Sequence, residues 1–400
     1  MRRNMFPTTA VAAAGLLLAG STAATRLYAT SYAGTVTTLD LVKAGAGSRL
    51  DIVDSTTACG PFPSWLHLDY SKSFIYCLDE AWGGEAGAVT SLYAHRNGSL
   101  TPISSAEVVV GPVSIAEFGL GGSGLAIAAY AGAGLNVVRS SPRGELKVVQ
   151  TETFTLDHPG TIPDRQEAPH PHQALLDPTG KFVLVPDLGA DLVRVYQADT
   201  RTLRLTPVKP LAVAPGAGPR HGVFKKVLNK TYYYLVTELA NTIIGYEVKY
   251  QRDNTLSFSE LFTIPMHADN RPLVDTAAVA EIALTPDERF LIVSSRWEGQ
   301  LTIPNFDRAN QTKIVSDPLI NFSIDNRTGA LKKIQEFPAG GMGPRGFSIN
   351  AEGNLLAVGL QGDGRVVVIK RDVRTGLLKN FVAAADVEGE VNHAIFYEDS

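Results

Sequence analysis

Hydrophobic and polar positions follow one layout that returns seven times along the chain. In each repeat a short apolar strand ends on small or polar residues, and a turn that often contains glycine leads to a second strand. The apolar segments are residues 27–32, 75–80, 126–131, 183–188, 234–239, 291–296 and 356–361. Their starts lie between 48 residues (27 to 75) and 65 residues (291 to 356) apart, which is enough for one four-stranded sheet each. Strand-only repeats of this length are typical of β-propeller blades.

The two ends of the chain predict how such a ring closes. Most of the seven segments follow another apolar strand and a polar turn, as in HQALLDPTGKFVLV, which is a β-hairpin signal. Segment 27–32 lacks that preceding strand, whereas an unmatched strand, NHAIFYE, stands at 392–398. We therefore expect an all-β, seven-bladed propeller of four-stranded antiparallel blades, closed by pairing of the C-terminal strand with the N-terminal strands. Closure removes exposed sheet edges. The even spacing without a linker disfavours an open sandwich or two domains.

The N-terminal residues have the features of a secretory signal. Arg2 and Arg3 precede an apolar stretch, 10–20, and a small-residue cleavage site follows at 21–23. This stretch is shorter than the about 20 residues that span a bilayer. We expect a signal peptide over 1–23, one propeller domain over 24–400, and a secreted, extracellular protein.

In an extracellular protein, cysteines can form disulfides and asparagine sequons can be glycosylated. Cys59 and Cys77 are the two cysteines of the chain, and in a secreted protein they form a candidate disulfide. The alternative is a pair of buried thiols. Candidate N-glycosylation acceptors are Asn97, Asn229, Asn310, Asn321 and Asn326.

Composition narrows the range of partners. The chain has 400 residues, 44% of them hydrophobic, and a net charge of −4 with both signs well mixed. No basic face indicates nucleic-acid binding, and no glycine-rich phosphate loop stands between a strand and a helix. We expect no nucleic-acid or membrane partner and no cofactor. Because a closed propeller needs no partner for stability, we expect a monomer.

Ionisable residues recur at equivalent places in the repeats. In a propeller, the loops at one mouth of the central channel bring such residues together. Directly after the apolar segments stand Glu80, Asp187, Glu238, Arg296 and Gln361, and at the preceding strands stand His170, His172, Arg220, His221, Glu281 and Arg345. A purely structural propeller would more often have small apolar residues there, so these positions predict a ligand site.

Structural interpretations compete with that prediction. His170 and His172 alternate along one expected strand, so they could share a face and hold a metal. Pro171 between them, with no cysteine or third histidine at a matching spacing, argues against a metal, and we expect none. Arg220 and Glu238 could form an ion pair that links two blades. Arg345 is expected to close against Glu281 or Asp187.

Several motifs in order carry a family resemblance. The segments HPHQALLDPTGKFVLVPDLGADLVRVY, GPRHGVF, VTELANTI, LTPDERFLIVSSR and GPRGFSINAEGNLLAVGLQGDGRVVV resemble the seven-bladed lactonase propellers. That family includes bacterial 6-phosphogluconolactonases and fungal 3-carboxy-cis,cis-muconate lactonising enzymes. The stretch CGPFPSWLHLDYSKSFIYCLDE is similar to the fungal branch, and the resemblance covers the whole chain after the signal.

The resemblance implies four catalytic residues, His172, Arg220, Glu238 and Arg296, matched by motif. Two guanidinium groups can hold a carboxylate or phosphate and stabilise an oxyanion, and His172 would be the base with Glu238 donating or orienting a proton. We expect His170, His221, Glu80, Asp187, Arg345 and Gln361 to bind substrate.

The resemblance implies a small-molecule lactone or unsaturated carboxylic acid as partner, handled by lactone hydrolysis or the related carboxymuconate cycloisomerisation. A secreted binding propeller without catalysis is the alternative. The enzyme interpretation fails if His172 and Glu238 lie at opposite mouths of the channel.

Overall fold

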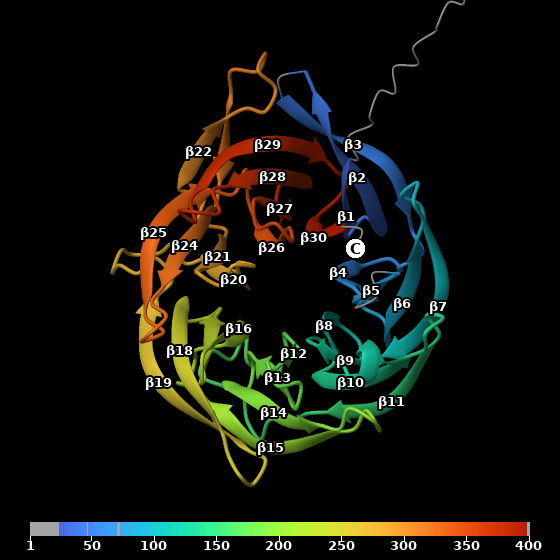
Figure 1. The fold of residues 1–400 in the computed structure, drawn as a ribbon, viewed down its shortest axis with the longest axis vertical. Helices are drawn as coiled ribbons and strands as arrows, with labels where there is room; N and C mark the ends of the chain where they lie inside the picture. The colour runs from blue at the N-terminus through green and yellow to red at the C-terminus, as the bar shows by residue number, and fades with distance from the viewer. Residues whose placement is uncertain (1–23, 46, 70–72, 398–400) are drawn as a thin grey trace, which may run out of the picture.

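Seven four-stranded antiparallel sheets surround a central axis in the computed structural model, which describes residues 24–45, 47–69 and 73–397 (Figure 1). The predicted all-β, seven-bladed propeller is confirmed. The expected signal peptide, 1–23, lies outside the described residues. No helix in the described part of the chain is long and apolar enough to cross a membrane.

The first four blades follow one another along the chain. The first contains β4 (Pro63–Leu68), β5 (Phe74–Asp79), β6 (Gly87–Ala94) and β7 (Leu100–Val108). The second contains β8 (Pro112–Phe118), η1 (Leu120–Gly122, a 3-10 turn), β9 (Gly124–Ala129), β10 (Gly134–Ser140) and β11 (Leu146–Thr153). The third contains β12 (Leu175–Leu176), β13 (Phe182–Asp187), β14 (Leu192–Ala198) and β15 (Leu205–Ala212). The fourth contains β16 (Pro219–Val227), β17 (Lys230–Thr237), β18 (Thr242–Tyr250) and β19 (Leu256–Pro265).

The remaining blades complete the circle. The fifth contains β20 (Ala278–Leu284), β21 (Phe290–Arg296), β24 (Pro318–Ile324) and β25 (Leu331–Pro338). The sixth contains β26 (Pro344–Ile349), β27 (Leu355–Leu360), β28 (Arg365–Arg371) and β29 (Leu378–Asp386). The seventh contains β30 (Val391–Tyr397), β1 (Thr25–Ser31), β2 (Thr35–Ala44) and β3 (Gly47–Thr56). A separate hairpin, β22 (Leu301–Pro304) with β23 (Lys313–Ser316), is inserted in the fifth blade and explains its longer repeat.

The seventh blade joins the two ends of the chain. β30 pairs antiparallel with β1, with Leu27 opposite Phe396 and Ala29 opposite Ala394. The expected closure by the C-terminal strand is therefore confirmed, and Figure 1 shows the red β30 beside the blue β1. The first strand of every blade, from β4 round to β30, lies nearest the axis (Figure 1).

Apolar side chains fill the spaces between neighbouring blades. Between the fourth and fifth blades, Tyr234 and Val236 of β17 pack with Val279 of β20 and Val293 of β21, and all four are fully buried. Burying one such side chain contributes roughly 1.5–3 kcal/mol. Since each blade supplies alternate residues to both neighbours, the blades hold one another at fixed angles around the axis.

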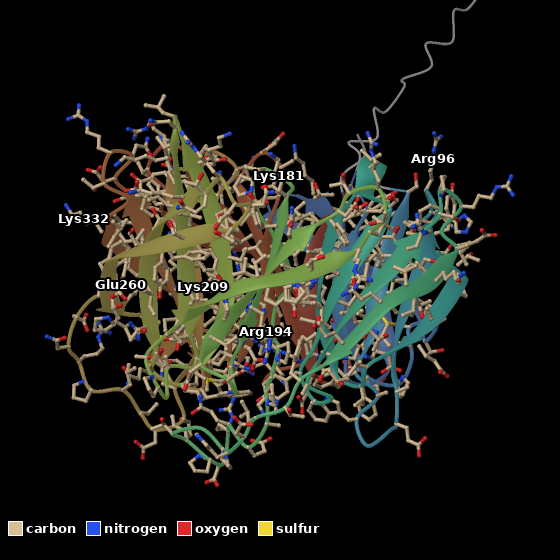
Figure 2. All side chains as sticks on the ribbon, turned by 90° about the horizontal axis from the view of Figure 1, so that it is seen from below. Arg96, Lys181, Arg194, Lys209, Glu260 and Lys332 are labelled. Atoms are coloured by element: carbon tan, nitrogen blue, oxygen red, sulfur yellow. A yellow bond between two sulfur atoms is a disulfide. The ribbon has the colours of Figure 1, made fainter. Side chains whose placement is uncertain are left out.

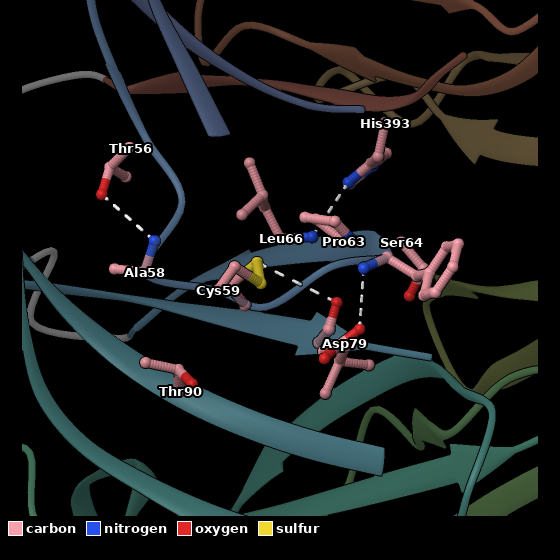
Figure 3. The surroundings of a disulfide bond; sticks show 12 residues. Thr56, Ala58, Cys59, Pro63, Ser64, Leu66, Asp79, Thr90 and His393 are labelled. Carbon is pink, nitrogen blue, oxygen red and sulfur yellow. Dashed lines mark hydrogen bonds between the residues drawn. A yellow bond between two sulfur atoms is a disulfide. The ribbon is translucent and has the colours of Figure 1, made fainter. Parts of the chain in front are cut away.

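A disulfide joins Cys59, in the segment between β3 and β4, to Cys77 in β5 (Figure 3). Their Cα atoms are 5.8 Å apart, within the range that disulfides require. The bond ties the connection from the seventh blade to the middle of the first blade. It therefore reinforces the part of the ring where the two ends of the chain meet.

The five sequons differ in accessibility. Asn97, Asn229, Asn310 and Asn326 are exposed outside the strands. Asn321 is fully buried in β24, and its Nδ2 donates a 2.9 Å hydrogen bond to the carbonyl oxygen of Gly376. The expectation that Asn321 is a glycosylation acceptor is wrong for the folded protein, because its amide is both covered and engaged.

Candidate active site

A cavity of about 200 Å³ lies where loops and strand ends of all seven blades converge on the axis. Its walls are formed by Tyr32, Glu80, Trp82, Val113, Tyr130, Arg165, His172, Arg220, Glu238, Arg296, Arg345 and Gln361. His172 and Glu238 thus share one mouth, which is the arrangement that the enzyme interpretation requires. In the side view of Figure 2, Lys181, just before β13, lies near the upper rim, and Arg194, the ion-pair partner of Asp187 at the other end of β13, lies below it.

The repeat places many of these residues at one backbone position. The residue directly after the second strand of a blade donates its main-chain N–H to a carbonyl oxygen just before the first strand. Glu80 N donates to Phe62 O, Glu238 N to Gly218 O and Gln361 N to Gly343 O. The same backbone geometry gives the side chains the same direction, so positions far apart in sequence meet at the cavity.

Glu238 is surrounded by three guanidinium groups. Its Oε2 accepts from Arg220 Nε at 2.8 Å and contacts Arg296 Nη2 at 3.1 Å, while Oε1 accepts from Arg165 Nη2 at 2.6 Å. Burial opposes ionisation of the carboxyl group, but Arg296, Arg220 and Arg165 outweigh it and lower the pKa of Glu238 to about 2. An ionised Glu238 cannot donate a proton at neutral pH. Of the two roles expected from the sequence, donating or orienting, the ionised carboxylate therefore suits orientation, here of the arginines that surround it.

The arginines leave surplus positive charge at the cavity wall. Burial, reinforced by Arg296, lowers the pKa of Arg220 to about 9, so it remains a cation at neutral pH. Arg220 Nη1 also donates to the carbonyl oxygen of Ala280 at 2.6 Å. Within the described chain, the buried Nε of Arg296 makes no hydrogen bond. Three guanidinium groups against one carboxylate, with unused donors, favour an anionic ligand.

A second polar cluster forms the opposite wall. Glu80 Oε1 accepts from Tyr32 Oη at 2.6 Å and from Arg345 Nη2 at 2.9 Å, and Glu80 Oε2 accepts from Trp82 Nε1 at 2.5 Å. Arg345 Nη1 donates to Tyr32 Oη as well. The expected partners of Arg345, Glu281 and Asp187, were wrong, because Glu80 reaches it from the first blade.

His172 presents a neutral imidazole to the cavity. Burial and the positive charges of Arg220 and Arg345 lower its pKa well below 6.5. Its Nδ1 is 3.1 Å from His221 Nε2, and the edge of its ring meets Tyr130 at a centroid distance of 5.5 Å. Among the described residues, Nε2 of His172 makes no hydrogen bond. The ring therefore has one nitrogen available to a ligand.

Behind His172, two further residues lie along the axis. His221 Nδ1 is 3.0 Å from Glu281 Oε1, and both side chains are buried. His221 also meets the edge of Trp65, which stacks on His393 at a centroid distance of 3.9 Å. His221, expected from the sequence to bind substrate, is not among the residues that line the cavity; it contacts His172 instead.

Two other expected binding residues also lie outside the cavity wall. His170 stacks on Tyr130, and its Nδ1 is 3.0 Å from the carbonyl oxygen of that tyrosine. Asp187 Oδ1 accepts from His170 N at 2.7 Å, and Oδ2 accepts from Arg194 Nε at 2.9 Å. Both residues thus shape the loop that carries His172. This loop is not the expected strand, because Pro171 makes one isolated bridge to Asp187 and β12 begins at Leu175.

Sequence reasoning missed Arg165, Tyr32, Tyr130 and Trp82. Tyr32 and Tyr130 follow β1 and β9 as Glu80 follows β5, so the repeat offset would have found them had aromatic residues been considered with ionisable ones. Arg165 comes from the long loop between β11 and β12, which no repeat position marks. Trp82 stands two residues after Glu80 and therefore lies outside the single repeat position that the sequence analysis considered.

A wider pocket adjoins the cavity. It has a volume of about 610 Å³, includes Trp297 and Asp275, and shares Arg165 and Glu238 with the cavity. In the part of the chain that the structure describes, no group of three or more His, Cys, Asp or Glu side chains is arranged to hold a metal ion.

Known proteins resemble this chain over nearly its whole length. A family model described as "Lactonase, 7-bladed beta-propeller" matches residues 26–394. The "Probable 6-phosphogluconolactonase" of Arthroderma benhamiae is 31% identical over 366 residues, which are 91% of this chain and 86% of the relative. The 6-phosphogluconolactonase of Bacillus subtilis is 25% identical over 317 residues, 79% of this chain and 82% of the relative.

Solved structures share the architecture. The periplasmic gluconolactonase of Pseudomonas aeruginosa has a TM-score of 0.74 and 22% identity, with 94% of this chain and 99% of that chain covered. At this identity the likeness concerns the fold. Because the family model spans every blade, from β1 to β30, the chain belongs to the seven-bladed β-propeller lactonase family.

Proposed function

We propose that the protein hydrolyses a lactone in the cavity formed by His172, Arg220, Glu238 and Arg296. One observation carries the proposal: a neutral histidine, whose Nε2 makes no hydrogen bond in the described chain, lines the same small cavity as a group of arginines with surplus positive charge. A base and an electrostatic stabiliser in one confined volume are the two components that acyl transfer to water needs.

The reaction can be written with these residues. Water attacks the lactone carbonyl carbon while its proton passes to Nε2 of His172. The carbonyl π electrons move to oxygen, and the resulting oxyanion is stabilised by Arg220 or Arg296. When the ring C–O bond breaks, the leaving alkoxide takes the proton from His172, and the product is a hydroxy acid. Glu238 holds the arginines in place throughout.

The charge of the cavity favours a substrate with a negatively charged or strongly polar substituent. Relatives are named for 6-phosphogluconolactone, but phosphorylated sugar lactones are intracellular, whereas this chain begins with an export-like segment. We therefore propose a lactone of a polyhydroxy or polycarboxylic acid as substrate class, with the phosphorylated sugar lactone as one member to be tested.

A panel of lactones tests the proposal. The purified protein would be assayed at neutral pH, by proton release, with gluconolactone, its 6-phosphate and carboxymuconolactone. We expect turnover of at least one, reduced 10²-fold or more by His172→Ala. Arg220→Ala should lower kcat/KM by a similar factor. Turnover that survives both substitutions would refute the site.

The same panel separates the alternatives. A cycloisomerase would place a carboxylate over a double bond and deliver a proton to carbon, so it would convert carboxymuconate and spare the saturated sugar lactones. A non-catalytic binding propeller would turn over nothing, yet would bind a lactone or acid in a calorimetric titration. Loss of that binding in Arg220→Ala would then assign the cavity to recognition.

We also propose that the protein is exported as a monomer and glycosylated. The signal-like segment 1–23 and the disulfide between Cys59 and Cys77 support export, because disulfides persist in oxidising compartments. Mass spectrometry of protein secreted by a eukaryotic host should find the mature N-terminus near residue 24. Glycans are expected among Asn97, Asn229, Asn310 and Asn326, and a glycan on Asn321 would contradict the fold around β24.

A further inference from the structure

We propose that Glu281 and His221 are positioning residues that hold His172 in the tautomer with its proton on Nδ1 and its lone pair on Nε2. The inference deepens the proposed hydrolysis and rests on it for the role of Nε2. It concerns two residues that do not reach the cavity and therefore act through His172.

The three side chains form one hydrogen-bonded row. Glu281 Oε1 is 3.0 Å from His221 Nδ1, and His221 Nε2 is 3.1 Å from His172 Nδ1. They come from three neighbouring blades: Glu281 from β20, His221 from β16, and His172 from the loop before β12. The row therefore runs across the inner edges of the blades and ends at the cavity.

The direction of each hydrogen bond follows from the charge of Glu281. Burial opposes its ionisation, but the hydrogen bond from His221 and the charge of Arg220 lower its pKa, and Glu281 Oε1 also accepts from the Ile282 N–H at 3.0 Å. An ionised carboxylate only accepts, so His221 Nδ1 carries the proton and donates it. Burial lowers the pKa of His221 as well, and a neutral His221 has its lone pair on Nε2.

That lone pair fixes the next bond. His221 Nε2 can only accept, so His172 Nδ1 carries the proton, and the lone pair of His172 is left on Nε2. The reverse row would set the lone pair of His221 Nδ1 against the carboxylate of Glu281, two acceptors 3.0 Å apart. The geometry thus selects one tautomer for each ring, and the selected one directs a base toward the cavity.

The row also stabilises His172 in its protonated form, which arises when water attacks the lactone. When His172 takes a proton on Nε2, its Nδ1–H becomes a stronger donor to His221, and His221 Nδ1–H a stronger donor to Glu281. Positive charge therefore spreads toward the carboxylate and away from Arg220 and Arg345, which oppose it. Edge contacts with Tyr130 and Trp65 limit rotation of the two rings.

The tautomers can be observed directly by NMR. The protein labelled with ¹⁵N-histidine would be recorded at pH 7, with His172→Gln and His221→Gln spectra to assign the two rings. We expect both rings neutral with protonated Nδ1 and unprotonated Nε2. A protonated Nε2 on either ring would overturn the proposal. The tautomers are read from the unsubstituted protein, and the two variants are needed only to assign its signals.

Kinetics test the consequence. Glu281→Gln keeps the shape but removes the charge, and we expect kcat to fall about 10²-fold or more with KM within about threefold. The acid limb of the pH profile should move to lower pH, because the base loses a favourable charge. Glu281→Asp should restore part of the loss. Unchanged kcat or an unmoved acid limb would contradict the proposal.

Glu117→Gln is the matched control. Glu117 is also a carboxylate beside a histidine on an innermost strand, 3.4 Å from His67, but it stands four residues along β8 from the cavity residue Val113, roughly 13 Å away. The activity of Glu117→Gln should stay within about threefold of that of the unsubstituted protein. An equal loss in Glu117→Gln would make the effect of Glu281→Gln a general one and overturn the positioning role.

The two proposals can fail separately. If no lactone is turned over but NMR shows the expected tautomers, the proposed hydrolysis fails while the hydrogen-bonded row stands. If a lactone is turned over but His172 carries its proton on Nε2, the positioning role fails and the hydrolysis stands.

Discussion

Arg220 and Glu238 stand at the same end of one hairpin, and Arg220 Nε donates a buried 2.8 Å hydrogen bond to Glu238 Oε2. Both residues belong to the fourth blade, since Arg220 lies in β16 and Glu238 follows β17. The sequence interpretation of this pair as a link between two blades was therefore wrong. Links between blades come from Arg296 and Arg165, which reach the same carboxylate from the fifth blade and from the long loop before the third.

Replacing the shared carboxylate should affect both stability and turnover. In Glu238→Gln three guanidinium groups lose their common partner, and we expect a loss of about 3–5 kcal/mol in the free energy of unfolding. A lower kcat/KM should follow because the arginines are no longer held. Urea denaturation at pH 7 measures the first effect. The exposed pair of Arg49 and Asp51 offers a control, since solvent screens this pair and Asp51→Asn should leave the free energy of unfolding nearly unchanged.

The stability effect should depend on pH in a defined direction. Because the folded protein lowers the pKa of Glu238 from 4.5 to about 2, its contribution is complete above pH 4.5 and disappears as the pH falls through about 2. The difference between the unsubstituted protein and Glu238→Gln should therefore shrink by about 3 kcal/mol over that range. A difference that stays constant between pH 5 and 2.5 would contradict this assignment.

The pH profile of activity should have a displaced acid limb. Burial and neighbouring positive charges favour neutral His172, so kcat/KM should stay level from pH 8 through 6.5 and fall only at more acidic pH. Steady-state rates across pH 4 to 9 with the best lactone of the panel would show this. A half-maximal rate at or above pH 6.5 would mean that another group controls the base.

Loss of the disulfide should lower stability without changing the site. Cys59 and Cys77 are 18 residues apart, and closing a loop of this length stabilises the folded state by about 3 kcal/mol in the chain-entropy model. The double substitution of both cysteines by serine should lower Tm, with kcat preserved within about twofold. Equal Tm values for the two proteins, or a Tm of the serine variant that still responds to reductant, would contradict a stabilising role for this bond.

Removal of the last described strand should prevent ring closure. A chain that ends before Val391 loses β30, so β1 loses its inner neighbour and the sixth and seventh blades lose Val391, Ala394 and Phe396 from their shared core. We expect aggregation or unfolding, judged by size-exclusion chromatography and circular dichroism. A chain that ends after Tyr397 is the control and should elute as the full chain does.

The repeat was sufficient to predict the fold because each blade repeats the same alternation of apolar strands and polar turns. It also predicted most of the cavity wall, since Glu80, Glu238, Arg296 and Gln361 stand at or beside one backbone position. The same rule misplaced Asp187, the last residue of β13, whose carboxylate bonds to the loop that contains His170. A shift of one residue along a strand reverses the side-chain direction.

Other features depended on contacts that no local pattern encodes. Arg165 reaches Glu238 across 73 residues from a loop without periodicity. The partner of Arg345 is Glu80, 265 residues away, because the sixth and first blades face the same cavity on either side of the closing blade. His221 was placed near the site correctly, but only the structure shows that it faces His172 and Glu281 rather than the cavity.

Ring closure by β30 has a consequence for the order in which the protein acquires activity. The cavity takes residues from Tyr32 in the N-terminal strands to Gln361 after β27, and β30 supplies His393 to the axis beside Trp65. A chain still emerging from the ribosome therefore has no complete cavity, however many blades have already formed. During refolding, hydrolysis should therefore begin only when β30 docks. The lag before hydrolysis begins would measure the rate of this last folding step.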